Sequence, residues 1–208
     1  MSNKKIMVIG GGPAGLEAAR GIIDLGYELV LVEQREELGG TPISASYAAL
    51  TPDMEDTETA MARMIDAVMN DSLADIRLGS SITSAEGAAP DLRVTLEKGG
   101  DSEVVEVGAV IVATGFKHFD PGKETQRYGY YEYDDVITLV DAEKMLKAGK
   151  FIRPSTGKPP EQVCFIQCVG SRDRQIGNEW CSKVCCGIAT KEAIEIRHLL
   201  PDCRVIVF

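Results

Sequence analysis

The chain has 208 residues, enough for one sizeable domain or for one domain and part of a second. Its composition is that of a globular protein, and its net charge of −10 without a basic stripe argues against nucleic acid and anionic membranes as partners. No segment has the length or hydrophobicity for membrane insertion, and no targeting segment is recognisable, so we expect a cytoplasmic protein.

The N-terminal region begins with a strand–turn–helix–strand pattern. Residues 4–10 predict a buried parallel strand, a helix follows to about Leu25, and residues 28–33 predict the next buried strand. This βαβ unit indicates an α/β fold with a parallel sheet.

The turn after the first strand carries the pattern Gly-x-Gly-x-x-Gly. Gly10 allows the tight turn, Gly12 lets the backbone approach a pyrophosphate, and Gly15 lets helix and strand pack closely. The helix N-terminus offers partial positive charge to phosphates. Glu33 ends the next strand, where its carboxylate can accept hydrogen bonds from both ribose hydroxyls. The pattern predicts a dinucleotide site; the alternative is a structural turn with a solvated glutamate.

The middle of the first half contains a mixture of elements. Residues 36–52 read as a loop, 54–70 as a helix and 74–78 as a short strand. Residues 80–108 predict a β-meander, and 109–113 another buried strand.

The second half begins with a polar, loop-rich stretch that holds one helix at about 142–147. It then repeats the strand–loop–helix–strand order, with expected elements at 162–168, 182–200 and 204–208. Two strands and one helix cannot cover a parallel sheet on both faces. We therefore expect either a fragment of a longer protein or a second chain that completes the sheet, which makes a homo-oligomer plausible.

All six cysteines lie in this second half, and four of them follow the pattern C-x12-C-x3-C-C. In a reducing compartment such clustering favours metal or redox chemistry over structural disulfides. Cys181 and Cys185 are expected on one face of a helix start, with Cys186 about 100° around the helix and Cys168 at the strand end.

Four converging thiolates can hold an iron–sulfur cluster or zinc. The adjacent pair Cys185-Cys186 fits the usual zinc knuckles poorly. Reduced core cysteines are the third alternative. The remaining Cys164 and Cys203 lie in or beside apolar strands and are expected in the core.

Other features of the second half carry less chemistry. Residues 168–173 lack the tight glycine turn, so we do not expect NAD to bind there. His118 and His198 look isolated, and His198 is expected to act as a favourable charge near a helix C-terminus.

Residues 33–41 (EQREELGGT) and 110–115 (VIVATG) resemble FAD-dependent oxidoreductases with two dinucleotide-binding domains. The resemblance implies FAD rather than NAD at the glycine turn. It also implies a set of contact residues around that cofactor: Gly10, Gly12, Pro13, Ala14, Gly15, Glu33, Gln34, Gly39, Gly40, Thr41, Ile82, Ala113, Thr114 and Gly115. Disulfide reductases of this class place a Cys-x4-Cys pair after the Gly-Gly segment. Residues 41–46 contain no thiol, so a dithiol reductase of that design is excluded.

Residues 168–173 (CVGSRD) and 180–186 (WCSKVCC) resemble the A subunit of heterodisulfide reductases. This resemblance spans the whole chain and implies FAD, a [4Fe–4S] cluster held by Cys168, Cys181, Cys185 and Cys186, and partner subunits of an electron-transfer complex. Because the first strand starts at Lys4, the chain resembles the short type found in bacterial sulfur metabolism.

The expected fold class is therefore α/β, with a Rossmann-like FAD-binding domain at 1–122, a connector at 123–160, and the start of a second, cluster-bearing βαβ domain at 161–208. The expected function is electron relay between FAD and the cluster. A stand-alone FAD oxidoreductase with structural zinc and a redox-inert FAD scaffold are the alternatives.

Overall fold

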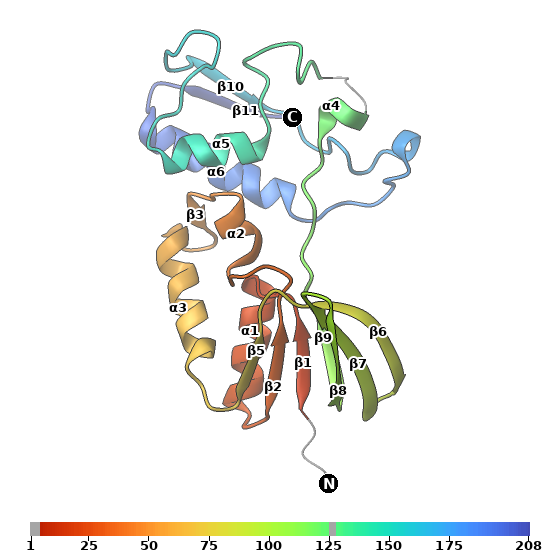
Figure 1. The fold of residues 1–208 in the computed structure, drawn as a ribbon. Coiled ribbons are helices and arrows are strands. Elements are labelled where there is room, and N and C mark those ends of the chain that lie inside the picture. The colour runs from red at the N-terminus through yellow and green to blue at the C-terminus, as the bar shows by residue number, and fades with distance from the viewer. Residues whose placement is uncertain (1–4, 125–127) are drawn as a thin grey trace. The chain divides into compact units, whose positions relative to one another are not determined.

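The computed structural model describes residues 5–124 and 128–208, which divide into two compact units (Figure 1). The first unit comprises the chain up to Ser44 together with Thr57–Phe116. The second comprises Ala45–Asp56 and Lys117–Phe208. Each unit has a hydrophobic core of its own.

A parallel sheet forms the centre of the first unit. Among the described residues its order is β5-β2-β1-β9, which places the N-terminal strand between the two strands that pair with it. Ile6 in β1 lies opposite Leu29 in β2 and Ala109 in β9. The strands are β1 (Ile6–Ile9), β2 (Leu29–Val32), β5 (Ala74–Arg77) and β9 (Ala109–Val112).

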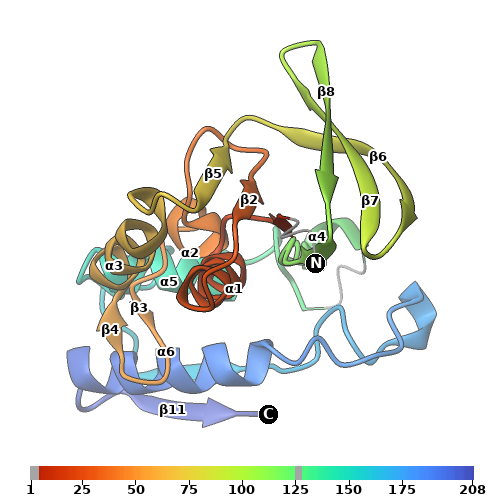
Figure 2. The same cartoon turned by 90° about the horizontal axis from the view of Figure 1, so that it is seen from below.

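Helices and a β-meander cover opposite faces of this sheet (Figure 2). Helix α1 (Pro13–Asp24) packs on the strands and against α3 (Thr57–Met69). The meander contains β6 (Ser81–Ala88), β7 (Asp91–Lys98) and β8 (Asp101–Val107).

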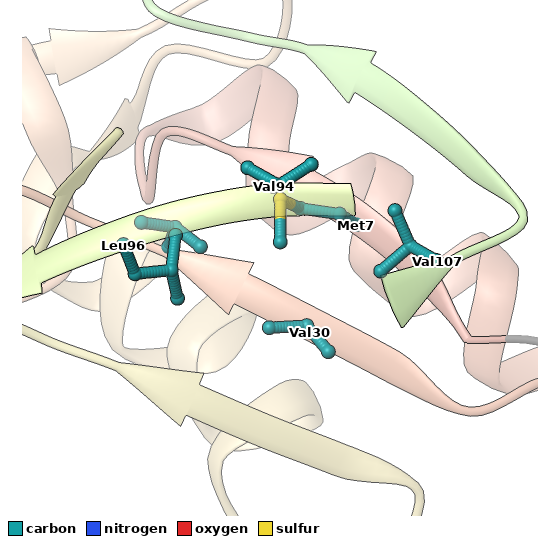
Figure 3. Packing of buried hydrophobic residues seen from close by; sticks show 6 residues of the cluster. Met7, Val30, Val94, Leu96 and Val107 are labelled. Atoms are coloured by element: carbon teal, nitrogen blue, oxygen red, sulfur yellow. The ribbon is translucent and has the colours of Figure 1, made fainter. Parts of the chain in front are cut away.

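The core between sheet and meander is entirely apolar. Met7 and Val30 of the sheet meet Val94, Leu96 and Val107 of the meander (Figure 3). Each fully buried side chain of this size contributes about 1.5–3 kcal/mol. The alternation of buried and exposed residues along β7 follows from one face packing on the sheet.

Strand β9 differs from the prediction of a buried strand. Among the strands that the structure describes, it pairs only with β1, at the edge of the sheet, and Val112 is 70% exposed. An unbroken apolar run predicts burial on both faces, but it does not reveal which strand lies at an edge.

The segment expected to be a loop at 36–52 contains short elements. These are α2 (Gly40–Ser44) and β3 (Ala49–Leu50), and β3 forms an antiparallel hairpin with β4 (Glu55–Asp56). The following helix α3 begins at Thr57 rather than at the expected Met54.

The second unit contains a two-stranded parallel sheet and two helices that pack on each other. Its core joins Phe151 and Phe165 to Ala189 and Ile196. The elements are α4 (Pro121–Glu124), α5 (Leu139–Lys147), β10 (Gln162–Phe165), the 3₁₀ helix η1 (Arg174–Ile176), α6 (Cys185–Leu199) and β11 (Arg204–Val207).

The two strands β10 and β11 are not buried on both faces as a complete parallel sheet would be. Cys164 and Ile166 are exposed, and Phe208 is 72% exposed. The expectation that Cys164 lies in the core is therefore wrong, because the outer face of β10 has no covering layer among the described residues. Cys203 is buried as expected.

The first compact unit ends at Phe116, and the expected domain boundaries at 122 and 160 stay predictions. Residues 45–56 group with the second unit, although they lie between two parts of the first unit in sequence. Helix α5, expected within a connector, contributes Ala142 to the core of the second unit.

Candidate nucleotide and cysteine sites

The glycine turn of the first unit is packed too closely to admit side chains. Gly10 follows β1 with φ of +108°, a conformation that favours glycine. A Cβ at Gly10 would overlap the carbonyl oxygen of Ala113, and one at Gly15 would overlap the carbonyl oxygen of Gly10. Gly12 is the N-cap of α1, with Pro13 as the first helical residue.

A second glycine segment lies directly against this turn. The backbone N–H of Gly39 donates to the carbonyl oxygen of Gly11 at 2.8 Å. Gly40 has φ of +61°, and a Cβ there would be only 2.6 Å from the Cα of Gly12. The backbone of Gly40 therefore packs directly on the backbone of Gly12, at the N-terminus of α1. Such an arrangement suits a pyrophosphate, because N–H groups and the helix dipole face the ligand.

Glu33 is fixed at the end of β2 by two backbone donors. Its side chain is buried; Oε2 accepts a hydrogen bond from the N–H of Gly11 at 2.7 Å, and Oε1 accepts one from Arg35 at 2.9 Å. Each carboxylate oxygen can accept more than one hydrogen bond, so capacity for ribose hydroxyls is left. The role of Glu33 in ribose binding stays a prediction.

The other expected contact residues surround the same edge of the sheet. The N–H of Ala113 donates to Ile9 and continues the β9 pairing to the point where Thr114 and Gly115 leave the sheet. Ser80, at the start of the meander, donates from its N–H to the carbonyl oxygen of Glu33, two residues before Ile82. The remaining residues are Ala14 in α1, exposed Gln34 after β2, and Thr41 in α2.

The cysteine pattern lies in the second unit, on the connection between β10 and α6. Cys168 follows β10 with φ of +60°, and Cys185 and Cys186 are the first two residues of α6. The expected helix start at Ser182 is wrong, since Val184 is the N-cap. Cys181 therefore lies in the loop, where its Sγ accepts the N–H of Lys183 at 3.3 Å, and not on a helix face with Cys185.

The four thiols are close enough to influence one another. The charge of Cys185 raises the pKa of Cys186, with smaller contributions from Cys168 and Cys181. The pKa of Cys185 is lowered, chiefly by the hydroxyl of Ser182 at 3.4 Å. The Arg172 guanidinium lies 3.7 Å from the Sγ of Cys168.

None of the six cysteines forms a disulfide, so the donor set for a thiolate-ligated group is available. Within residues 5–124 and 128–208, no three His, Cys, Asp or Glu side chains form a closed metal-binding group. The number and chemical type of the donors fit a four-thiolate cluster.

His118 is not isolated. The hydroxyl of Tyr47 lies 3.2 Å from its Nε2, and burial lowers its pKa, opposed by the charge of Glu143. His198 lies in the last turn of α6, as expected.

A group of buried charged residues, Glu143, Lys191 and Glu192, was not predicted. For this group, the only signal in the sequence is the run of acidic and basic residues within the otherwise apolar helix α6.

Among the described residues, no helix is long and apolar enough to cross a membrane.

Several curated proteins are similar to this chain. The A subunit of the ferredoxin/F(420)H(2)-dependent CoB-CoM heterodisulfide reductase of Methanosarcina acetivorans is 42% identical over 125 residues, which are 58% of this chain and 16% of that protein. The A subunit of the H(2):CoB-CoM heterodisulfide,ferredoxin reductase of Methanothermobacter marburgensis is 28% identical, with 98% of this chain and 43% of that protein covered. The chain thus spans less than half the length of these relatives.

Solved structures share the fold. The L-proline dehydrogenase of P. horikoshii superposes with a TM-score of 0.51 and 16% identity over 99% of this chain and 35% of that one. At that identity the likeness concerns the fold alone. Residues 4–150 match the family described as pyridine nucleotide-disulphide oxidoreductase. The chain therefore belongs to this family of FAD-dependent oxidoreductases.

Proposed function

We propose that the chain is an electron-transfer flavoprotein subunit that binds FAD in its first unit and a [4Fe–4S] cluster in its second. The observation that carries the proposal is the presence, in one chain, of a backbone cradle of two glycine segments and of four free thiols around the start of α6. FAD can exchange electrons in pairs or singly, and an iron–sulfur cluster exchanges them singly.

The residues of the first unit would bind and orient the dinucleotide. Because Gly12 and Gly40 carry no side chains, their backbones pack on each other, and phosphate oxygens would bind the N–H groups at the start of α1 beside them. Glu33 would accept hydrogen bonds from the ribose, and its negative charge would disfavour a 2′-phosphate. The same carboxylate holds the N–H of Gly11, which fixes the loop before the ligand arrives.

The residues of the second unit would hold the cluster through Cys168, Cys181, Cys185 and Cys186. Cys168 and Cys181 lie on the connection between β10 and α6, and Cys185 and Cys186 lie in the first turn of α6. Cys185 and Cys186 begin α6, where the partial positive charge of the helix favours thiolates. Because no thiol pair follows Gly40, the cysteine group is the redox partner that the chain itself offers to a flavin.

The wider setting is also part of the proposal. The similar proteins are named as subunits of heterodisulfide reductases, so we infer that this chain works with partner subunits in a complex of that kind. Those relatives are methanogen proteins and lend no support to the short bacterial type. A place in sulfur metabolism, cytoplasmic localisation and a homo-oligomer stay predictions.

The proposal is tested by cofactor analysis of the full chain purified without oxygen. We expect about one FAD, and about four iron and four acid-labile sulfide per chain. Cys185→Ser should lose the iron and sulfide and keep the FAD, because the two sites lie in different units.

Cys164→Ser is the matched control, since Cys164 is an exposed thiol on β10 outside the cysteine pattern. It should keep both cofactors. Zinc in place of iron would contradict the cluster and favour a stand-alone FAD oxidoreductase with structural zinc. Loss of FAD together with iron in Cys185→Ser would contradict the separation of the two sites.

A further inference from the structure

The second unit buries three charged side chains that neither cofactor site uses. Glu143 of α5 and Lys191 of α6 are 1% and 4% exposed, and Glu192 of α6 is fully buried. Ionised groups in a core are costly unless each is paired and hydrogen-bonded. The partners of each group therefore decide its protonation state.

Glu143 and Lys191 are well satisfied. The ammonium of Lys191 lies 2.6 Å from Oε2 of Glu143, and the same oxygen accepts the N–H of Ala48 at 2.9 Å. Lys191 also donates to the carbonyl oxygen of Ala49 at 3.2 Å and lies 3.1 Å from Glu195. The Glu143–Lys191 ion pair thus holds the segment that contains β3 against α5 and α6.

Glu192 is not satisfied as a carboxylate. Neither of its oxygens accepts a hydrogen bond, although both are buried. A protonated Glu192 instead has a donor, which can bond to the carboxylate of Glu143. If Glu192 is protonated, the group contains one neutral carboxylic acid, one carboxylate and one ammonium, and each of them can have a hydrogen-bond partner.

The surrounding charges act in the same direction. Burial, together with the charges of Glu143 and Glu195, raises the pKa of Glu192 to about 9, although the charge of Lys191 opposes this shift. Tyr47 faces the group from the β3 segment with its pKa raised to about 12, chiefly by burial. His118 packs on Tyr47, and burial lowers the pKa of its imidazole.

We propose that Glu143 and Glu192 form a proton-binding site, in which one shared proton keeps the segment around β3 fastened to α5 and α6. Without that proton, two carboxylates face each other beside one ammonium. Their repulsion would then act on Glu143, which holds Ala48 directly and Ala49 through Lys191.

The sign of the pH dependence follows from the proton count. In the unfolded chain Glu192 ionises at its ordinary pKa, whereas the folded unit keeps the proton up to about pH 9. Between these values the folded state binds one more proton, so stability falls as pH rises. One proton corresponds to about a tenfold fall in the folded-to-unfolded ratio for each pH unit.

The test compares the full chain with Glu192→Gln, which keeps a hydrogen-bond donor and has no proton to lose. Urea unfolding of the second unit is followed from pH 5.5 to 10 by a brief hydrogen-exchange pulse and mass spectrometry of α6 peptides. Relative to Glu192→Gln, the wild type should lose about a thousandfold in its folded-to-unfolded ratio between pH 5.5 and 8.5, and level off above about 9. Glu161→Gln, an exposed glutamate of the same unit, should run parallel to the wild type.

Parallel curves for wild type and Glu192→Gln would overturn the proposal, because they would mean that Glu192 is ionised in the folded state. If Glu192→Gln does not fold, the wild type still provides a direct measurement. Carbon-13 NMR of the glutamate carboxyls should then show one group titrating near pH 9, and exchange of the Ala48 N–H, corrected for its intrinsic rate, should accelerate over the same range. Titration of every glutamate below pH 6 would equally overturn it.

Discussion

Each unit contains a strand followed by a helix and a parallel strand, β1–α1–β2 in the first and β10–α6–β11 in the second. The two units differ in the length of the connection between the first strand and the helix. In the first, β1 ends at Ile9 and α1 begins at Pro13, so three residues make the connection. In the second, β10 ends at Phe165 and α6 begins at Cys185, so nineteen residues make it. Both helices then lead to a parallel neighbouring strand.

This difference separates two ways of presenting a ligand. The short connection holds its glycines in backbone-to-backbone contact, so peptide N–H groups would bind the ligand under the proposed function. The long connection and the first turn of α6 carry partly exposed thiols, so side-chain sulfurs would bind the ligand under the proposed function. A change in packing should therefore damage the first site, whereas a change in side-chain chemistry should damage the second.

The largest effect is expected from Gly15→Ala in the first unit. The new Cβ would overlap the carbonyl oxygen of Gly10, which is a backbone atom and not the end of a flexible side chain that could move aside. We expect a loss of about 5 kcal/mol or more in unfolding free energy, the range of exceptional core disruptions, together with the loss of FAD. Urea denaturation and flavin content measure the two effects.

Gly21→Ala is the control on the same helix. Nothing lies within 4 Å of its added Cβ, so the change should stabilise α1 by about 0.5–1 kcal/mol. If the two variants have the same unfolding free energy and the same flavin content, the close contact at Gly15 is not required, and the short connection does not depend on backbone packing.

The short connection was also the part most fully predicted from sequence. The strand, helix and strand around Gly10–Gly15 are found within a few residues of their expected ends, because burial and glycine geometry are local properties of the chain. The three strands of the meander were found for the same reason, since alternation and turn residues are local as well.

The second unit was predicted less well, because its structure depends on contacts between residues that are distant in sequence. The start of α6 at Cys185 instead of Ser182 moves Cys181 off the helix. The partner of Lys191 is Glu143, 48 residues away, and no local pattern pairs them. The exposure of Cys164 depends on whether another layer covers that face of β10, and the local sequence pattern does not predict this.

An intermediate effect is expected from Glu33→Gln, which tests whether a side chain also supports the glycine turn. The amide would place a donor against the N–H of Gly11 or of Arg35, so one buried hydrogen bond is lost. We expect a loss of about 1–3 kcal/mol in unfolding free energy and weaker FAD binding, measured by denaturation and calorimetric titration.

Glu28→Gln, at the residue before the same strand, serves as its control. Glu28 is half exposed and 3.8 Å from Lys5, so the change should be within about 0.5 kcal/mol of zero. A Glu33→Gln protein as stable as the Glu28→Gln protein would mean that the buried carboxylate does not hold the turn.

The smallest effect is expected in the cysteine connection, where Lys183 has φ of +62°. A left-handed conformation costs a non-glycine residue about 1–2 kcal/mol, and Lys183→Gly would remove that cost. The added freedom of the unfolded chain offsets about 0.4–1 kcal/mol of the gain. We therefore expect the cofactor-free protein to become more stable by about 0.5 kcal/mol, measured by urea denaturation. Lys144→Gly in the exposed interior of α5 should cost about 1 kcal/mol, so the same substitution should have opposite signs at the two sites. A loss at Lys183 as large as at Lys144 would show that this side chain holds the connection in place, as the packed backbone does in the first unit.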